Sequence, residues 1–139
     1  MVPNKACPVV FHDSRRSRIL VFRHPSAGIQ LIKGGIEPRE EPHAAALREL
    51  REESGIADAV VSQDLGLWDA AFDEQIWSLH LCATAREFPE RWSHRCLDYG
   101  SVDLTFFWHD FDADPTEEWH PLFRRALACI RSRIRRSAR

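Results

Sequence analysis

Residues 34–56 read GGIEPREEPHAAALRELREESGI, and this stretch governs the interpretation of the whole chain. Three of its six glutamates, Glu49, Glu52 and Glu53, lie three and four positions apart in a run of good helix formers. An α-helix turns by about 100° per residue, so the three carboxylates share one face of a predicted helix. Like charges at this spacing repel one another, and a solvated acidic face is the simplest explanation of the cluster. A hard divalent cation is the alternative, because Mg²⁺ binds carboxylate oxygens and removes the repulsion.

The residues that precede the helix favour the metal explanation. Lys33 is followed by Gly34 and Gly35, and paired glycines permit backbone conformations and close approaches that a side chain forbids. A glycine-rich loop that leads into a helix aims backbone amides and carbonyls at a phosphate or a metal. Lys33 is therefore a candidate phosphate ligand, and the alternative is an exposed lysine with no such role.

The spacing of the whole stretch matches a known motif. It fits, without a gap, the pattern G-x5-E-x7-R-E-U-x-E-E-x-G-U, where U is a bulky apolar residue. The matching positions are Gly34, Glu40, Arg48, Glu49, Leu50, Glu52, Glu53, Gly55 and Ile56. The pattern resembles the Nudix box, the signature of the Nudix hydrolases. The resemblance implies an α/β fold, an α/β/α sandwich with a mixed β-sheet between helical layers, and an enzyme that hydrolyses a nucleoside diphosphate linked to another group X.

The resemblance also implies roles for individual residues. Glu49, Glu52 and Glu53 match the metal-binding carboxylates, and Mg²⁺ is the expected cofactor, with Mn²⁺ as a substitute. In some members the glutamate that matches Glu49 is the general base instead, so the catalytic roles of Glu49 and Glu52 stay open. Arg48 matches the arginine that pairs with a glutamate of the same loop–helix unit and orients it, and Glu40 is the expected partner.

The expected substrate contacts are Lys33, Gly34 and Gly35. A Lys-Gly pair before this loop is similar to members that act on dinucleoside polyphosphates, which makes these compounds the first candidates. Diphosphoinositol polyphosphates, nucleoside triphosphates, sugar nucleotides and 5′-triphosphate RNA ends are the alternatives within the family. A nucleotide-binding regulator without activity is an alternative of another class, but such members usually lose box carboxylates, and every one is present here.

The composition predicts an ordinary soluble globular protein, because 44% of the 139 residues are hydrophobic and 29% are charged. We expect a single domain over residues 1–139. No apolar run approaches the roughly 20 residues that span a bilayer, and residues 1–7 lack the layout of a signal peptide, so a cytoplasmic location is the default expectation. The four cysteines are scattered without a C-x-x-C pair, which favours reduced, mostly buried thiols.

The expected partner is a small phosphoanhydride substrate, with no membrane and no nucleic acid apart from an RNA 5′ end. The sequence does not indicate an oligomeric state. Seven arginines and no acid lie between Pro121 and Arg139. We expect this basic end to be the solvated face and frayed tail of a last helix rather than a nucleic-acid surface.

Periodicity and turn residues divide the rest of the chain. Expected strands cover residues 8–12, 17–23, 29–32, 60–68, 76–83 and 104–108, and expected helices run from Pro42 to a C-cap at Gly55 and from Pro121 to about Ile134. Residues 114–117 begin like a helix, but Pro121 limits them to a turn.

Residues 86–101 follow neither the hydrophobic period of a helix nor that of a strand, and they are expected to be irregular. Arginines and aromatic residues alternate there, which suits either contact with a substrate base or a solvated loop with Trp92 packed beneath it. A further metal carboxylate or base from outside the box has its candidates in and beside the same segment: Glu87, Glu90, Asp98 and Asp103.

Overall fold

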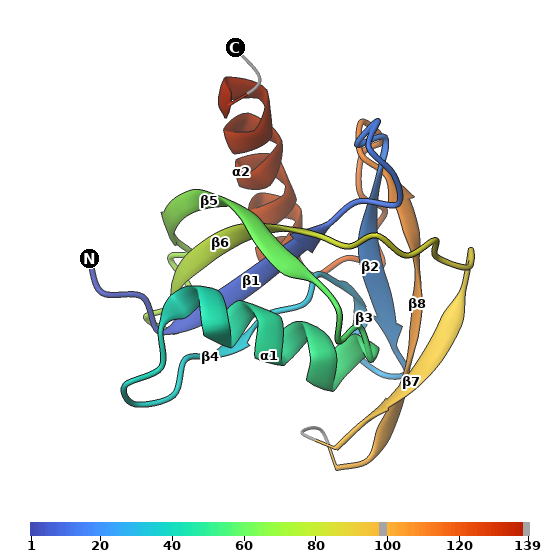
Figure 1. The fold of residues 1–139 in the computed structure, drawn as a ribbon, viewed down its shortest axis with the longest axis horizontal. Helices are drawn as coiled ribbons and strands as arrows, with labels where there is room; N and C mark the ends of the chain where they lie inside the picture. The colour runs from blue at the N-terminus through green and yellow to red at the C-terminus, as the bar shows by residue number, and fades with distance from the viewer. Residues whose placement is uncertain (98–99, 138–139) are drawn as a thin grey trace.

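The computed structural model describes residues 1–97 and 100–137, whose strands form two four-stranded sheets (Figure 1). In chain order the elements are β1 (Lys5–Val10), β2 (Arg18–His24), β3 (Gly28–Gln30), β4 (Gly34–Gly35), α1 (Pro42–Ser54), β5 (Val60–Asp69), β6 (Ile76–Ala83), β7 (Trp92–Cys96), β8 (Val102–Asp110) and α2 (Pro121–Ser137). The first sheet has the order β4-β1-β6-β5 and is mixed, because β1 and β6 run parallel while the other pairs are antiparallel. The second sheet, β3-β2-β8-β7, is antiparallel throughout.

The two helices pack on opposite faces of the mixed sheet (Figure 1). Successive side chains of a strand point to opposite faces. Cys7 of β1 accordingly belongs to the buried cluster that contains Leu127 of α2. Its neighbour Ala6 packs instead with Ala45 and Ala46 of α1. This arrangement confirms the expected α/β/α sandwich with a mixed sheet between helical layers.

Helix α1 has the limits that its sequence predicts. Pro42 occupies the first turn, where its missing N–H breaks no helical hydrogen bond. Gly55 ends the helix in the left-handed conformation with φ of 83°, and its amide donates to the carbonyl of Arg51. Leu50, in the middle of the helix, is fully buried. Within the described residues, neither helix is long and apolar enough to cross a membrane.

Helix α2 is longer than expected, and its arginines brace the fold. Arg133 donates to the carbonyls of Leu65 and Leu67 at 2.6 and 2.7 Å. Arg131 donates to the carbonyls of Phe111 and Ala113. The expectation of a solvated face with a frayed tail was therefore wrong for these side chains, because a guanidinium makes strong hydrogen bonds to the backbone carbonyls of β5 and of the segment after β8.

The segment 86–101 contains the main departure from the expected strands. Trp92–Cys96 forms β7, which pairs antiparallel with β8. Trp92 and Cys96 lie toward the core while Arg95 between them is exposed, which is the period of a strand. The expectation of a wholly irregular segment was wrong. The alternation of buried and exposed residues in β7 is short and is obscured in the sequence by neighbouring charged residues, and the strand forms only because it pairs with β8.

Candidate active site

Arg48 lies at the centre of the box carboxylates. Its guanidinium donates to Glu40 from both Nε and Nη2 at 2.8 Å, to Glu49 at 2.9 Å and to Glu52 at 3.2 Å. Nη2 also donates to the carbonyl of Gly35 at 2.8 Å. One guanidinium thus joins the glycine loop, the Glu40 loop and the helix, and the pairing of Arg48 with Glu40 is the one expected from the sequence.

Glu40 is held as a carboxylate by this contact. The hydrogen bonds from Arg48 lower the pKa of Glu40 to about 2, and the amide of Glu37, which donates to Oε1 at 3.0 Å, adds to the effect. The same contact raises the pKa of Arg48 above its usual value. Both partners are therefore charged at neutral pH, and the ion pair fixes the loop against α1.

The two glycines of β4 have different surroundings. Gly34 and Gly35 pair with Ala6 and Lys5 of β1. A β-carbon on Gly34 would overlap the carboxylate of Glu49, whereas the nearest atom to a β-carbon on Gly35 is the Lys5 ammonium nitrogen at 4.0 Å. Glycine is therefore required at position 34, because any side chain there would displace the Glu49 carboxylate.

The carboxyl end of α1 is held by β7. Trp92 donates from Nε1 to the carbonyl of Ser54 at 2.9 Å, and Nδ1 of His94 lies 3.0 Å from the carbonyl of Glu53. Glu53 itself is only 1% exposed and Glu49 is 6% exposed, so the helix places two box carboxylates in the interior. The Trp92 and His94 contacts were not predicted, because they depend on the pairing of β7 with β8.

Two lysines border the glycine loop. Lys33 is half-buried, with Nζ 5.9 Å from the ring centre of Trp77. Burial lowers the pKa of Lys33, and the charge of Lys5 lowers it further, while Glu53 acts in the opposite direction. Lys5 did not emerge from the sequence as a site residue, because its position beside Gly35 follows from the register of β1 with β4.

The donor set at the box fits a hard divalent cation. Glu49, Glu52 and Glu53 offer carboxylate oxygens, which such cations prefer, and Gly34 leaves room at Glu49 that a side chain would fill. In residues 1–97 and 100–137, no three His, Cys, Asp or Glu side chains are already gathered in a metal-holding arrangement. In this structure Glu49 and Glu52 instead form ion pairs with the guanidinium of Arg48.

The carboxylates considered outside the box lie elsewhere. Glu90 forms an ion pair with Arg18 at 2.7 Å, and Asp103 pairs with Arg95 at 3.1 Å. Glu87 lines a separate cleft. Asp98 falls outside the described residues.

Comparison with known proteins identifies the family. The model of the NUDIX domain matches residues 3–122. The chain belongs to the Nudix hydrolase family. Two mouse proteins, diphosphoinositol polyphosphate phosphohydrolases 3-alpha and 3-beta, are each 31% identical to it over 91 residues, which is 63% of this chain and 54% of theirs. The chain thus matches only about half the length of these curated relatives.

Solved structures share the fold at low sequence identity. An ADP-ribose pyrophosphatase from Streptococcus suis has a TM-score of 0.63 and 17% identity, and the match covers 95% of this chain and 93% of that one. A UDP-X diphosphatase has a TM-score of 0.71 and 15% identity, with 99% of this chain and 65% of that one covered. These likenesses establish the fold.

Proposed function

We propose that the chain is a divalent-metal-dependent pyrophosphohydrolase that cleaves a nucleoside diphosphate linked to a group X. The observation that carries the proposal is the grouping of the box residues around Arg48. The guanidinium gathers Glu40, Glu49 and Glu52, and Glu49 packs directly against Gly34.

The reaction requires water to add to a phosphorus atom while the bridging P–O bond breaks. The proton of the water passes to a base, and Glu49 and Glu52 are the candidates. Arg48 contacts both carboxylates, so it orients whichever one accepts the proton. Glu49, Glu52 and Glu53 would hold Mg²⁺, with Mn²⁺ as a substitute, and the cation would supply charge neutralisation at the phosphates.

Lys33 and the Gly34–Gly35 backbone would contact the phosphates, and we add Lys5 to this set. The charge of Lys5 lowers the pKa of Lys33, so a phosphate placed between the two ammonium groups relieves their repulsion. The ring of Trp77 holds Lys33 in position, which reduces the entropy lost when a phosphate binds.

For the substrate, dinucleoside polyphosphates are our first candidates and diphosphoinositol polyphosphates the second. The Lys33-Gly34 pair supports the first class, and two lysines suit a short chain of phosphates. The names of the two mouse relatives support the second class. A ligand with many phosphate groups, however, needs more cations than this pair supplies.

A screen for phosphoanhydride hydrolysis tests the proposal. Purified protein is incubated with Mg²⁺ and dinucleoside polyphosphates, diphosphoinositol polyphosphates, nucleoside triphosphates, sugar nucleotides and 5′-triphosphate RNA, and the products are separated chromatographically. We expect turnover of at least one class, abolished by chelator and restored by Mg²⁺ or Mn²⁺. Binding of nucleotides without turnover of any class would support the non-catalytic regulator instead.

A further inference from the structure

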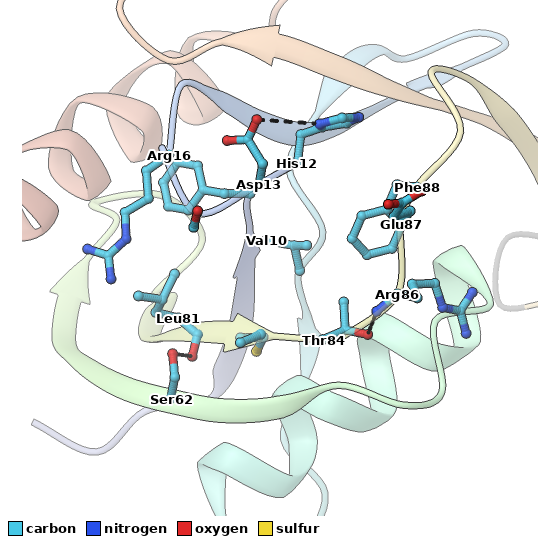
Figure 2. Close-up of a pocket in the computed structure, with 14 residues that line it drawn as sticks. Val10, His12, Asp13, Arg16, Ser62, Leu81, Thr84, Arg86, Glu87 and Phe88 are labelled. Atoms are coloured by element: carbon cyan, nitrogen blue, oxygen red, sulfur yellow. Dashed lines mark hydrogen bonds and ion pairs between the residues drawn. The ribbon is translucent and has the colours of Figure 1, made fainter.

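A cleft of about 700 Å³ opens at the carboxyl ends of β1 and β6, and its size is that of a small-molecule site. Its walls come from the turn after β1, from the end of β6 and from residues 86–88 (Figure 2). No residue of the segment 33–56 is among the described residues that line it. The cleft is therefore separate from the box.

Two of the four acidic and basic side chains that line the cleft, Arg86 and Asp13, already have partners. Arg86 forms an ion pair with Asp58 at 3.0 Å. Asp13 lies 3.9 Å from Nδ1 of His12, and its other oxygen accepts a hydrogen bond from the amide of Arg15 at 3.0 Å. These groups shape the rim, and little of their charge remains available to a ligand.

Arg16 and Glu87 are different. Neither side chain makes an ion pair or hydrogen bond that the structure shows among the described residues, and both are exposed. Figure 2 shows Arg16 on one side of the cleft and Glu87 on the other, with Val10 between them. Arg16 has a φ of 56°, a left-handed conformation that a residue with a side chain rarely adopts. The turn thus holds Arg16 at the cleft against its backbone preference.

The wall beside Glu87 is aromatic. Phe88 lines the cleft, and its ring packs against Trp92 and Trp108 with centroid distances of 6.0 and 5.2 Å. These contacts hold the ring in place before a ligand arrives. A preorganised aromatic ring next to a carboxylate suits a nucleobase, because the base stacks on the ring while its N–H groups donate to the carboxylate.

We propose that this cleft is a second binding site, for a nucleoside monophosphate. The base stacks on Phe88 and donates to Glu87, and the phosphate pairs with Arg16. Of the two arginines that line the cleft, Arg86 is paired with Asp58, and only Arg16 has no ion pair among the described residues, so Arg16 marks the phosphate end. The choice of ligand class rests on the proposed function, since hydrolysis of a nucleoside diphosphate linked to X yields such a monophosphate. The cleft is then a place where product binds away from the reaction.

The test is calorimetric titration of the full chain with GMP, AMP, guanosine and inorganic phosphate, in chelator so that no metal occupies the box. We expect GMP to bind more tightly than AMP, because the guanine edge offers two adjacent N–H donors to Glu87. Guanosine and phosphate alone should bind more weakly than GMP. Arg16→Gln and Glu87→Gln should each weaken GMP binding at least about tenfold, the scale of a charge-assisted hydrogen bond.

Matched controls separate a built site from general surface charge. Arg15→Gln removes a neighbouring arginine that does not line the cleft, and Glu90→Gln removes an acid that pairs with Arg18. Both should leave GMP binding unchanged. An equal loss in Arg15→Gln and Arg16→Gln, or no GMP binding at millimolar concentration, would overturn the proposal.

A box variant distinguishes the two sites. Glu52→Gln should leave GMP binding in chelator unchanged. Loss of GMP binding in that variant would show that GMP binds at the box, and would overturn the proposed second site. If the substrate screen finds no turnover while GMP binding still depends on Arg16, the proposed hydrolase function is wrong and the proposed binding site in the cleft is supported. If turnover is found but GMP does not bind, only the proposed binding site in the cleft is contradicted.

Discussion

Arg48 donates two hydrogen bonds of 2.8 Å to the two carboxylate oxygens of Glu40, one from Nε and one from Nη2. Its remaining nitrogen, Nη1, contacts Glu49 and Glu52. The planar guanidinium therefore binds the Glu40 loop with one edge and helix α1 with the other. An ammonium group lacks this fork and cannot hold both sets at once.

Arg48→Lys should accordingly lower kcat on the order of 10²-fold, the cost of a misplaced catalytic group, and change KM much less. Steady-state kinetics on the substrate that the screen identifies will measure both constants. Arg51→Lys, an exposed position on the same helix, is the matched control and should leave kcat near wild type. Unchanged kcat in Arg48→Lys would show that the guanidinium fork is not needed for turnover.

The low pKa of Glu40 predicts how stability depends on pH. Its pKa is about 2 in the folded protein, below the usual value of about 4.3. A depressed folded pKa contributes stability that is present above the unfolded pKa and is lost as the pH falls toward the folded value. Glu40→Gln should therefore melt at a lower temperature than wild type at pH 7, and the gap should narrow between about pH 4.5 and pH 2.

Melting curves of wild type, Glu40→Gln and Glu41→Gln across that range check this. Glu41 is exposed at the start of α1 and makes no side-chain capping bond, so its variant should track wild type throughout. A melting gap for Glu40→Gln that stays constant from pH 7 to pH 2 would contradict the assigned ion pair.

The glycine pair offers a steric test. Gly34→Ala places a methyl group where the Glu49 carboxylate lies, so that side chain must move. Gly35→Ala meets only the flexible end of Lys5 at 4.0 Å. We expect Gly34→Ala to lose about 10²-fold in kcat and Gly35→Ala to lose little. Equal kinetics for the two variants would mean that Glu49 does not need its position against the loop.

The sequence predicted features that are local and missed those that depend on distant pairing. The limits of α1 follow from Pro42, from the helix formers and from Gly55, all within one segment. The Arg48–Glu40 contact also lies within that segment, so the motif carries it. In contrast, Lys5 reaches the glycine loop only because β1 pairs with β4. No short stretch of sequence contains that information.

The cleft at the ends of β1 and β6 was missed for the same reason. Its walls join residues near position 12 with residues near position 86, and the parallel pairing of Val10 opposite Cys82 brings them together. The Arg-rich helix shows a different limit. Its charges indicated a solvated face, but the acceptors for Arg133 are backbone carbonyls of β5, which have no sequence signature.

The role of the box carboxylates is tested by Glu52→Gln and Glu53→Gln, which keep the shape of the side chain and remove one charge. Without metal the two substitutions act differently. Glu52→Gln relieves like-charge repulsion but also weakens a partly exposed contact with Arg48, so its net effect should be within about 1 kcal/mol. Glu53 is 1% exposed, and its amide replacement carries no charge into the interior, so the variant should fold.

With Mg²⁺ the two variants should behave alike. A ligand that binds only the folded state stabilises it by RT ln(1 + [L]/Kd), so the loss of a metal ligand removes that gain. We expect Mg²⁺ to raise the melting temperature of wild type and of Glu41→Gln, and to raise that of Glu52→Gln and Glu53→Gln much less. Turnover of both box variants should fall about 10²-fold or more, the scale of general-base and electrostatic terms. If both keep the wild-type melting shift and turnover, these carboxylates do not hold the metal, and the acidic face of α1 is solvated charge.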